Sequence, residues 1–383
     1  MMLWWILLIL GIAKGDNRVE FDVTETSIFS ASINCLTSYQ TAHKITCSFH
    51  LKNNGQRDYS VLKWRTPLEG MTSDCLTVTR NGEKIQYDGI YMKRSLPGPD
   101  EFLLMAAGQT VSSTFDVSMG YDMTKAGTYS IAVDTYLEYA VGSVKGLNVP
   151  GKPGIQTKIA HLSSPAEVFQ VIANDLTKRT LGQRARSLED RKRFSDKSFS
   201  RRMLGPKRPL SEQNDAAAVA PLGAIVKHCT ASQRRATKEV HRAAYHSIKS
   251  AIPDLENNPG RVKTWFGETP VKDATKIFEK MEEILRSDKI TYVFGGKYCE
   301  KDMFAYTFPG TRKIYLCKSY QKSPKLSGFD NKMGILTHEL SHALGHTDDK
   351  LYGQSACKQL AKKAPRRALK NADNYEYFVE TLG

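Results

Sequence analysis

Hydrophobic and polar positions alternate over the first part of the chain, from about residue 17 to residue 146. Apolar side chains occupy every second position in residues 19–23, 45–51, 115–117 and 129–133. A period of two is typical of a strand that buries one face. Asn81 and Gly82 separate two further strand-like stretches and form a strong signal for a tight hairpin turn. The pattern predicts a β-sandwich of the immunoglobulin-like kind.

The hydrophobic period changes to that of helices after residue 228. Thr230 and Gln233 have the spacing of a capping box in front of a helix over residues 231–251. A second amphipathic helix is expected over residues 271–285, directly after Pro270. Short apolar stretches predict strands at 290–294, 304–308 and 313–317, ahead of a further helix at 335–344. We therefore expect an α+β fold, with a mainly helical C-terminal domain that contains a small sheet.

The first residues have the pattern of a secretory signal peptide. Residues 3–13 are an apolar run that is too short to span a bilayer, and Ala13-Lys14-Gly15 has the form of a signal-peptidase site. No later apolar run reaches the length of a membrane span. The sequence thus predicts a signal peptide over residues 1–15 and a secreted, extracellular protein without a membrane span.

A basic stretch over residues 178–215 divides the chain. It holds 12 Lys or Arg against 5 Asp or Glu, including several adjacent basic pairs. We interpret it as a linker that processing proteases cut, because a signal peptide precedes it; a basic arm for nucleic acid or anionic surfaces is the alternative. Residues 16–177 would then form a prosegment and residues 216–383 the mature domain. The former holds 14 basic against 17 acidic residues and the latter 28 against 18, which favours docking between them.

A possible metal site lies in the last of the predicted helices. His338 and His342 are four residues apart and would project from one helix face, where two imidazoles can hold one Zn²⁺. Glu339 lies beside them and suits a general base that activates water. With nine His in 383 residues, such a motif has a chance expectation of only about 0.01 per chain. Chance and a pair of hydrogen-bonded core histidines are the weaker interpretations.

A catalytic zinc needs a third protein ligand. Asp349 follows His342 by seven residues, and Gly345 can end the helix and turn the chain back toward the metal. Asp348 is the neighbouring alternative, and Glu376 is a more distant one. Tyr352 is placed to donate its phenol to the oxyanion of a tetrahedral intermediate.

These residues resemble the motif of a known family. HELSH followed by Thr347, Asp349, Tyr352 and Gly353 is similar to the aspzincin, or deuterolysin-type, metalloendopeptidases. The resemblance implies a zincin-like fold, one zinc per catalytic domain, an aspartate as third ligand and hydrolysis of peptide bonds. The family usually has glycine where this chain has His346, which leaves that histidine as a possible additional ligand.

A second block, NADNYEYF over residues 371–378, resembles the peptidyl-Lys subgroup of the same family. In that subgroup an aspartate and a glutamate form an acidic pocket for the lysine that follows the scissile bond. The matching residues here are Asp373 and Glu376, which would share a helix face. Ordinary surface acids on an exposed helix are the alternative. The likeness to the family extends over about residues 228–382.

Seven cysteines in a secreted chain predict disulfides with one thiol left over. Cys299 and Cys317 flank the predicted hairpin and match a bridge that the resemblance implies. Cys229 and Cys357 would then form a second bridge. The three remaining cysteines lie in the prosegment, where a spare thiol is either buried or a ligand that blocks the zinc.

The sequence as a whole predicts a secreted zinc metalloendopeptidase made as a zymogen. Its partners would be protein or peptide substrates and its own prosegment as inhibitor, with no nucleic acid. The alternative from another class is a basic secreted binding protein or toxin that keeps the motif without turnover.

Overall fold

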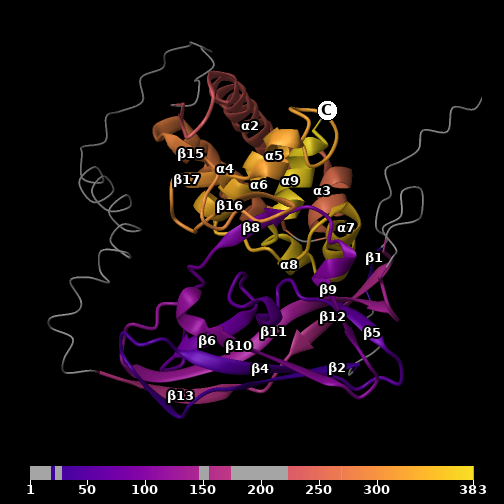
Figure 1. Ribbon diagram of the computed structural model, residues 1–383. Coiled ribbons are helices and arrows are strands. Elements are labelled where there is room, and N and C mark those ends of the chain that lie inside the picture. The colour runs from indigo at the N-terminus through magenta and orange to yellow at the C-terminus, as the bar shows by residue number, and fades with distance from the viewer. Residues whose placement is uncertain (1–18, 22–27, 146–154, 174–222, 269, 383) are drawn as a thin grey trace, which may run out of the picture.

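The computed structural model describes residues 19–21, 28–145, 155–173, 223–268 and 270–382 (Figure 1). The predicted signal peptide and the basic linker at 178–215 lie outside the described residues. A β-rich N-terminal part, drawn in indigo and magenta, lies below a C-terminal part of helices and strands, drawn in orange and yellow. Over the described ranges, no helix is both long and apolar enough to cross a membrane.

Two sheets build the N-terminal part. The smaller sheet has the order β10-β4-β2, with β2 (Phe29–Asn34), β4 (Thr46–Asn53) and β10 (Thr110–Asp116). The larger sheet contains nine strands. They are β1 (Val19–Phe21), β3 (Ser38–Gln40), β5 (Tyr59–Leu62), β6 (Leu76–Arg80), β7 (Glu83–Lys84), β9 (Phe102–Met105), β11 (Gly127–Val141), β12 (Thr157–Ser163) and β13 (Glu167–Ile172).

The alternating pattern places one face of each sheet in a shared core. Phe49 and Leu51 of β4 are fully buried and pack in the same cluster as Ile131 of β11. The predicted hairpin is confirmed, because Asn81 and Gly82 connect β6 to β7 with φ of 51° and 83°. Positive φ at both positions is what a tight hairpin of this kind requires.

The C-terminal part packs eight helices around a five-stranded sheet among the described residues. The helices are α2 (Ala231–Asn257), α3 (Pro259–Phe266), α4 (Lys272–Ser287), α5 (Lys318–Lys322), α6 (Lys332–Gly345), α7 (Gln354–Lys363), α8 (Pro365–Ala368) and α9 (Ala372–Glu380). The sheet has the order β14-β15-β17-β16-β8, with β14 (Ala224–Lys227), β15 (Ile290–Phe294), β17 (Lys313–Leu316), β16 (Met303–Thr307) and β8 (Tyr91–Arg94). The predicted α+β class is confirmed.

The sequence signals for the helices hold. Thr230 caps α2 and exchanges hydrogen bonds with Gln233 in a capping box. Helix α4 buries Ile277, Phe278 and Met281 on the predicted stripe. Helix α6 is buried from Met333 to Gly345, because α2, α4 and α9 pack around it. The central helix of this part is therefore the one that carries the histidines.

Strand β8 joins the two parts of the molecule. It comes from the N-terminal half of the chain but pairs antiparallel with β16, so that Lys93 lies opposite Ala305 and Met92 opposite Tyr306. Figure 1 shows this purple strand lying against the orange C-terminal part. This strand is not predictable from the sequence, since four residues are too few to show a period.

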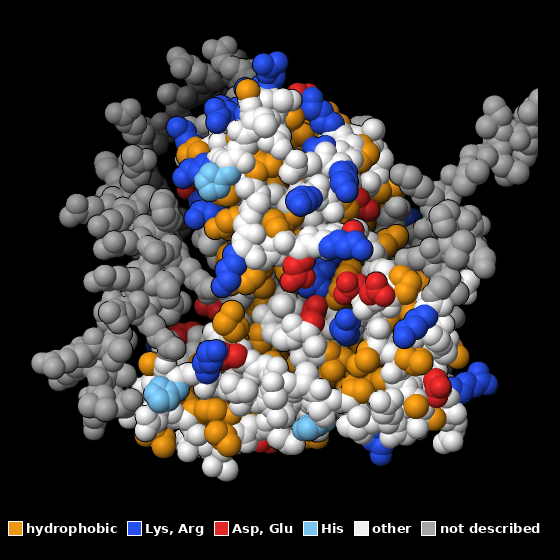
Figure 2. All heavy atoms as spheres, in the orientation of Figure 1, with side chains coloured by type: hydrophobic (Ala, Val, Ile, Leu, Met, Phe, Trp, Pro, Cys, Tyr) orange, Lys and Arg blue, Asp and Glu red, His pale blue; other side chains and the backbone are white. Residues whose placement is uncertain are grey.

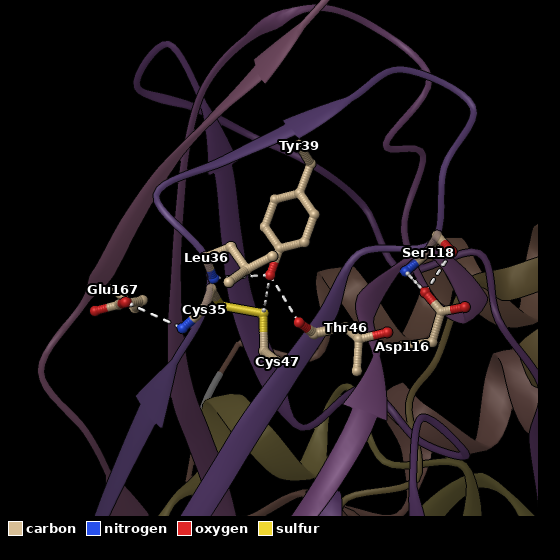
Figure 3. Close-up of a disulfide and its surroundings, with 8 residues drawn as sticks. All are labelled: Cys35, Leu36, Tyr39, Thr46, Cys47, Asp116, Ser118 and Glu167. Atoms are coloured by element: carbon tan, nitrogen blue, oxygen red, sulfur yellow. Dashed lines mark hydrogen bonds between the residues drawn. A yellow bond between two sulfur atoms is a disulfide. The ribbon is translucent and has the colours of Figure 1, made fainter.

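The predicted disulfides are only partly correct. Cys299–Cys317 is present, and Cys35–Cys47 is a second bridge, beside Tyr39 (Figure 3). The Tyr39 hydroxyl donates a hydrogen bond to the carbonyl of Thr46, at 2.7 Å.

The predicted bridge between Cys229 and Cys357 is wrong, because both are free thiols. Cys229 is half-buried just before α2, with its thiol against the Val226 carbonyl. Cys357 is fully buried in α7, where its sulfur lies 3.4 Å from the Asn371 side-chain amide. The spare thiol of the N-terminal part is Cys75, which is also fully buried, and burial raises its pKa to about 12.

Candidate active site

Helix α6 presents His338 and His342 one turn apart, and both are completely buried. Asn331 is the N-cap in front of the helix, and its side-chain oxygen accepts a hydrogen bond from the Gly334 amide at 3.0 Å. This cap satisfies one of the free amides of the first turn and fixes where the helix starts. The histidines therefore lie on a rigid, packed element rather than on a loop.

Asp349 completes a triangle of donor atoms with the two histidines. The Nε2 atoms of His338 and His342 are 3.0 Å apart, and Asp349 Oδ1 lies 3.2 Å from the first and 3.1 Å from the second. A tetrahedral zinc with ligand distances of about 2.0 to 2.1 Å holds its donor atoms about 3.3 Å apart. Two imidazoles and one carboxylate are also the donor types that zinc accepts. The residues therefore fit a zinc ion.

Hydrogen bonding orients the ring of His342 for such a role. Its Nδ1 lies 2.8 Å from the carbonyl oxygen of Thr347. A carbonyl can only accept, so Nδ1 carries the proton and Nε2 offers its lone pair to the triangle. On His338, Nδ1 lies 2.8 Å from Asp373 Oδ1, which favours the same tautomer.

The turn after α6 explains how Asp349 returns to the histidines. His346 adopts the left-handed conformation, with φ 56° and ψ 44°, and its amide donates to the carbonyls of Ser341 and His342. The expectation that Gly345 makes the turn is wrong. A Cβ atom on Gly345 would lie 2.7 Å from Ile277, so this glycine allows close packing of α6 on α4. His346 thus occupies a position that favours glycine.

The three alternative ligands, Asp348, His346 and Glu376, do not complete a group with both histidines. Among the described residues, neither Asp348 nor His346 belongs to a group of potential metal ligands. Asp348 accepts a hydrogen bond from the Tyr91 hydroxyl at 2.8 Å and pairs with Lys350 at 3.2 Å. Glu376 forms a second group with His338 and Asp373, but not with His342. The geometry favours Asp349 as third ligand.

Glu339 and Tyr352 both contact strand β8. Glu339 is fully buried, and its Oε1 accepts a hydrogen bond from the Lys93 amide at 3.2 Å, while Oε2 has no partner among the described residues. Burial raises the pKa of Glu339 to about 8. The Tyr352 hydroxyl donates to the carbonyl oxygen of Met92 at 2.6 Å. The Glu339 carboxylate and the Tyr352 hydroxyl thus face the two sides of the Met92–Lys93 peptide bond.

Asp373 and Glu376 form a buried acidic pocket, so the alternative of exposed surface acids is wrong. Both lie on α9 and are fully buried. The Lys93 ammonium fills the pocket, with Nζ 2.9 Å from Asp373 Oδ1, 2.9 Å from Glu376 Oε2 and 3.0 Å from Asp330 Oδ1. Neither Lys93 nor Asp330 was predicted from the sequence as part of this pocket. No local signal links Lys93 to a helix that lies 280 residues later.

Lys93 and Asp373 keep their charges in this pocket although both are buried, whereas burial raises the pKa of Glu376. Burial alone lowers the pKa of Lys93, but the carboxylates of Asp330, Asp373 and Glu376 outweigh this effect and raise it well above its usual value. Burial likewise raises the pKa of Asp373, and the ammonium of Lys93 outweighs it and leaves it at about 2. The site therefore holds a lysine side chain in its cationic form.

A cavity of about 370 Å³ runs alongside β8, between the two parts of the molecule. Met92 and Arg94 line it, together with Glu69 on one side and Tyr298 and Phe308 on the other. None of its lining residues belongs to the donor triangle, because β8 lies between the cavity and the histidines. Figure 2 shows Lys and Arg side chains spread over the upper, C-terminal part, and Asp and Glu side chains gathered near its boundary with the lower part.

Comparisons with known proteins agree with this site. Residues 252–380 match the family model of the aspzincins, described as lysine-specific metallo-endopeptidases. An extracellular protease of Aeromonas hydrophila is 29% identical over 339 residues, which cover 86% of each chain. A peptidyl-Lys metalloendopeptidase of Pleurotus ostreatus is 32% identical over 158 residues, or 40% of this chain and 94% of the relative. Among solved structures, a zinc peptidase from Grifola frondosa shares 31% identity over 40% of this chain and 96% of its own, with a TM-score of 0.37.

The motif, the buried donor triangle and these relatives define the class of the protein as a zinc metallopeptidase. Within that class, the chain belongs to the aspzincin family of metalloendopeptidases, in its peptidyl-Lys subgroup.

Proposed function

We propose that the chain is a secreted zinc metalloendopeptidase, made as a zymogen, that hydrolyses peptide bonds on the amino side of lysine. One zinc would be held by His338, His342 and Asp349 in the catalytic domain, residues 216–383. The observation that carries this proposal is the triangle of three buried donor atoms with edges of 3.0, 3.1 and 3.2 Å. When bound there, zinc would act as a Lewis acid that polarises the substrate carbonyl and lowers the pKa of water.

The residues around the triangle have separate roles in this proposal. Glu339 accepts a proton from the attacking water and then delivers it to the amine of the leaving strand. The Lys93 amide nitrogen, 3.2 Å from Glu339 Oε1, occupies the position proposed for that amine. Tyr352 donates its hydroxyl to the carbonyl oxygen as negative charge develops there. Thr347 and Asp373 hold the histidine rings in orientation.

The proposed lysine preference rests on the buried carboxylates. Asp330, Asp373 and Glu376 surround one ammonium group with contacts of 2.9 to 3.0 Å. A compact ammonium on a long stem reaches such a pocket, whereas a planar guanidinium needs a wider fork of acceptors. Digestion of an unfolded protein of known sequence, followed by mass spectrometry of every product, should show new amino termini mostly at lysine and far fewer at arginine. A map without a lysine excess would leave a general zinc endopeptidase.

The N-terminal part would be the prosegment. We assign residues 1–15 to a signal peptide, 16–177 to an immunoglobulin-like inhibitory domain and 178–215 to a linker that processing removes. Two mostly antiparallel sheets around one core, and a strand that contacts the candidate active site, support this assignment. Protein and peptide substrates, rather than nucleic acid, are then the partners of the mature enzyme.

Variants of the processed enzyme test the metal and the base. His342→Ala should lose both zinc and hydrolysis, because it removes one corner of the triangle. Glu339→Gln should keep its zinc and lose hydrolysis of a lysine-containing peptide by at least about 100-fold, the scale of a general base. His246→Ala is the control, since this histidine is exposed on α2. Zinc is measured by plasma mass spectrometry. Full hydrolysis by Glu339→Gln would exclude Glu339 as the base, whereas a wild-type chain that binds zinc but hydrolyses no peptide would favour the binding-protein alternative.

The third ligand needs its own comparison. Asp349→Ala should abolish stoichiometric zinc, whereas Glu376→Ala should retain it, because only Asp349 lies beside both Nε2 atoms. The reverse result would identify the chain as a zinc peptidase with a glutamate ligand.

A further inference from the structure

Strand β8 lies in the active site as an added strand of the C-terminal sheet. It extends the free edge of β16 in antiparallel register over its four residues. Addition of an extended segment to a sheet edge is a common way for proteins to recognise peptides, since backbone hydrogen bonds give affinity and side-chain pockets give selectivity. The chain's own N-terminal part thus occupies the edge where a peptide substrate would bind.

The peptide bond between Met92 and Lys93 faces the catalytic groups. Tyr352 donates to the carbonyl of Met92 at 2.6 Å, and the amide of Lys93 donates to Glu339 at 3.2 Å. The Met92 amide donates to Asp349 Oδ2 at 3.1 Å. The groups that would act on a substrate therefore converge on this one bond.

The side chain of Lys93 fills the acidic pocket on the C-terminal side of that bond. It is only 1% exposed and contacts three carboxylates. Burying an ammonium group costs free energy unless carboxylates pair with it. Removing one partner of such a buried pair strongly destabilises the structure, because the other charge is left without compensation. Lys93 is therefore both the side chain that the pocket selects and a strong attachment of the N-terminal part.

The residues on either side of this bond are also held. Tyr91 stacks on the His342 ring with 4.3 Å between centroids and an interplanar angle of 5°. Arg94 pairs with Glu69 at 2.7 Å and lies over the Trp64 ring, both in the N-terminal part. These contacts fix β8 along its length, so the register of Met92 and Lys93 is set on both sides.

We propose that β8 is a tethered pseudo-substrate, in which the Met92–Lys93 bond occupies the position of the bond to be cut and Lys93 keeps the precursor closed. This inference rests on the proposed peptidase function and specifies how the prosegment inhibits it. Because β8 lies far upstream of the basic linker, a cut in that linker leaves the strand paired with β16 in the active site. The processed prosegment then acts as a separate competitive inhibitor until it dissociates.

A purely structural role for Lys93, as an ion pair that joins two domains, makes a different prediction. In that case its replacement destabilises the precursor as a whole. A pseudo-substrate predicts instead that β8 leaves the active site while both cores stay folded, and that the isolated segment competes with substrates.

The test uses the uncut full-length chain with Lys93→Met, and with Lys84→Met on exposed β7 as the matched control. In zinc-free protein, hydrogen exchange of the amides at 91–94 should become at least about tenfold faster in Lys93→Met, while the cores at 129–133 and 335–344 keep their protection. In zinc-loaded protein of verified intact mass, the same variant should hydrolyse a lysine-containing peptide at least about tenfold faster than wild type. The control should match wild type in both measurements.

A synthetic peptide of residues 89–96 provides a measurement that does not depend on precursor folding. It should inhibit the processed enzyme competitively, and the same peptide with methionine in place of Lys93 should inhibit at least about tenfold more weakly. The proposal would be overturned if the amides at 91–94 of Lys93→Met exchange as slowly as in wild type, if this variant hydrolyses the peptide substrate no faster than wild type, and if the synthetic peptide does not inhibit. If the processed enzyme hydrolyses no peptide at all, the proposed function fails instead, and the exchange data still report on β8.

Discussion

His338 links the two halves of the active site through its two ring nitrogens. Its Nε2 faces His342 and Asp349, while its Nδ1 lies 2.8 Å from Asp373. Asp373 Oδ1 in turn contacts the lysine ammonium at 2.9 Å. One carboxylate therefore contacts a proposed metal ligand and, in the proposed function, also recognises the substrate lysine, which would couple metal affinity to selectivity at this residue.

We predict that Asp373→Asn and Asp330→Asn separate these two roles. Both should lower the preference for lysine by about 1 to 3 kcal/mol of transition-state binding, the scale of a charged hydrogen bond. Only Asp373→Asn should also weaken zinc binding, by about 10-fold or more, because it replaces the carboxylate 2.8 Å from His338 Nδ1 with a neutral amide. Asparagine tolerates the positive φ of 53° at position 330. Cleavage maps and zinc titration against a chelator measure the two effects, and equal zinc affinities would contradict the coupling.

The lowered pKa of a second histidine, His241, predicts how the free energy of unfolding depends on pH. His241 is buried in α2 with Nδ1 at 2.9 Å from the Tyr292 hydroxyl, and burial lowers its pKa to about 4. The unfolded chain takes up a proton below about pH 6.5, whereas the folded chain does not until about pH 4. Its neutral, buried state therefore makes folding less favourable by about 1.4 kcal/mol per unit as pH falls through this window.

His241→Gln should remove that contribution. Its free energy of unfolding should fall less between pH 6.5 and about 4.5 than that of wild type, in urea titrations of the full chain monitored on the C-terminal part. His246→Gln, at an exposed position of the same helix, is the control and should keep the wild-type slope. Buried carboxyl groups contribute equally to the pH dependence of unfolding in all variants, so their contributions cancel in the comparison. Identical slopes in His241→Gln and wild type would show that the imidazole is protonated in the folded protein.

At the scale of elements, local signals predicted the C-terminal helices well. The Thr230 side chain accepts from the Gln233 amide at 3.2 Å, and Gln233 Oε1 accepts from the Thr230 amide at 2.7 Å. We expect Thr230→Ala to destabilise the C-terminal part by about 0.5 to 2 kcal/mol, since it removes an N-cap. Ser287→Ala near the end of α4, where the hydroxyl bonds only its own helix, is the comparison and should cost less. Chemical denaturation of both variants measures the difference, and equal stabilities would mean that packing alone fixes the start of α2.

The candidate site divides into parts that the sequence could and could not predict. His338, Glu339 and His342 are set by helix geometry, and Asp349 follows His342 by seven residues, so short-range spacing places all four. Strand β8 depends on pairing across more than 200 residues, which no local period encodes. The Cys229–Cys357 bridge was inferred by elimination among cysteines, without a distance, and the fold keeps these two thiols in different surroundings.

At the scale of the whole molecule, the two parts meet at more than the active site. Arg367 of the C-terminal part pairs with Asp134 at 3.0 Å, and Lys350 approaches Asp74 at 3.9 Å. Tyr136 and Ile159 pack in one apolar cluster with residues of α7 such as Leu360. The two parts are thus also held together by charge and by apolar contacts away from β8, and we expect that cutting a single connection does not separate them.

This arrangement predicts that the zinc-loaded precursor slowly cuts itself between Met92 and Lys93. The bond has the register of a substrate, with Tyr352 on its carbonyl and Glu339 on its amide. Hydrolysis adds one water across the C–N bond, leaving a carboxylate on Met92 and a free amine on Lys93, and no other reactant is needed. Both new ends stay paired with β16, so the fragments should remain associated and elute together in gel filtration.

Amino-terminal mass spectrometry of the incubated precursor should therefore detect a chain that begins at Lys93. Glu339→Gln should give none, because it lacks the base, and Lys93→Met should give far less, because it lacks the side chain that sets the register. Dilution should leave the fraction cut per hour unchanged, since the bond and the catalytic groups belong to one molecule. A rate proportional to concentration would instead place the cut between molecules, and an intact bond in an otherwise active preparation would mean that β8 is held too firmly for the tetrahedral geometry of the reaction.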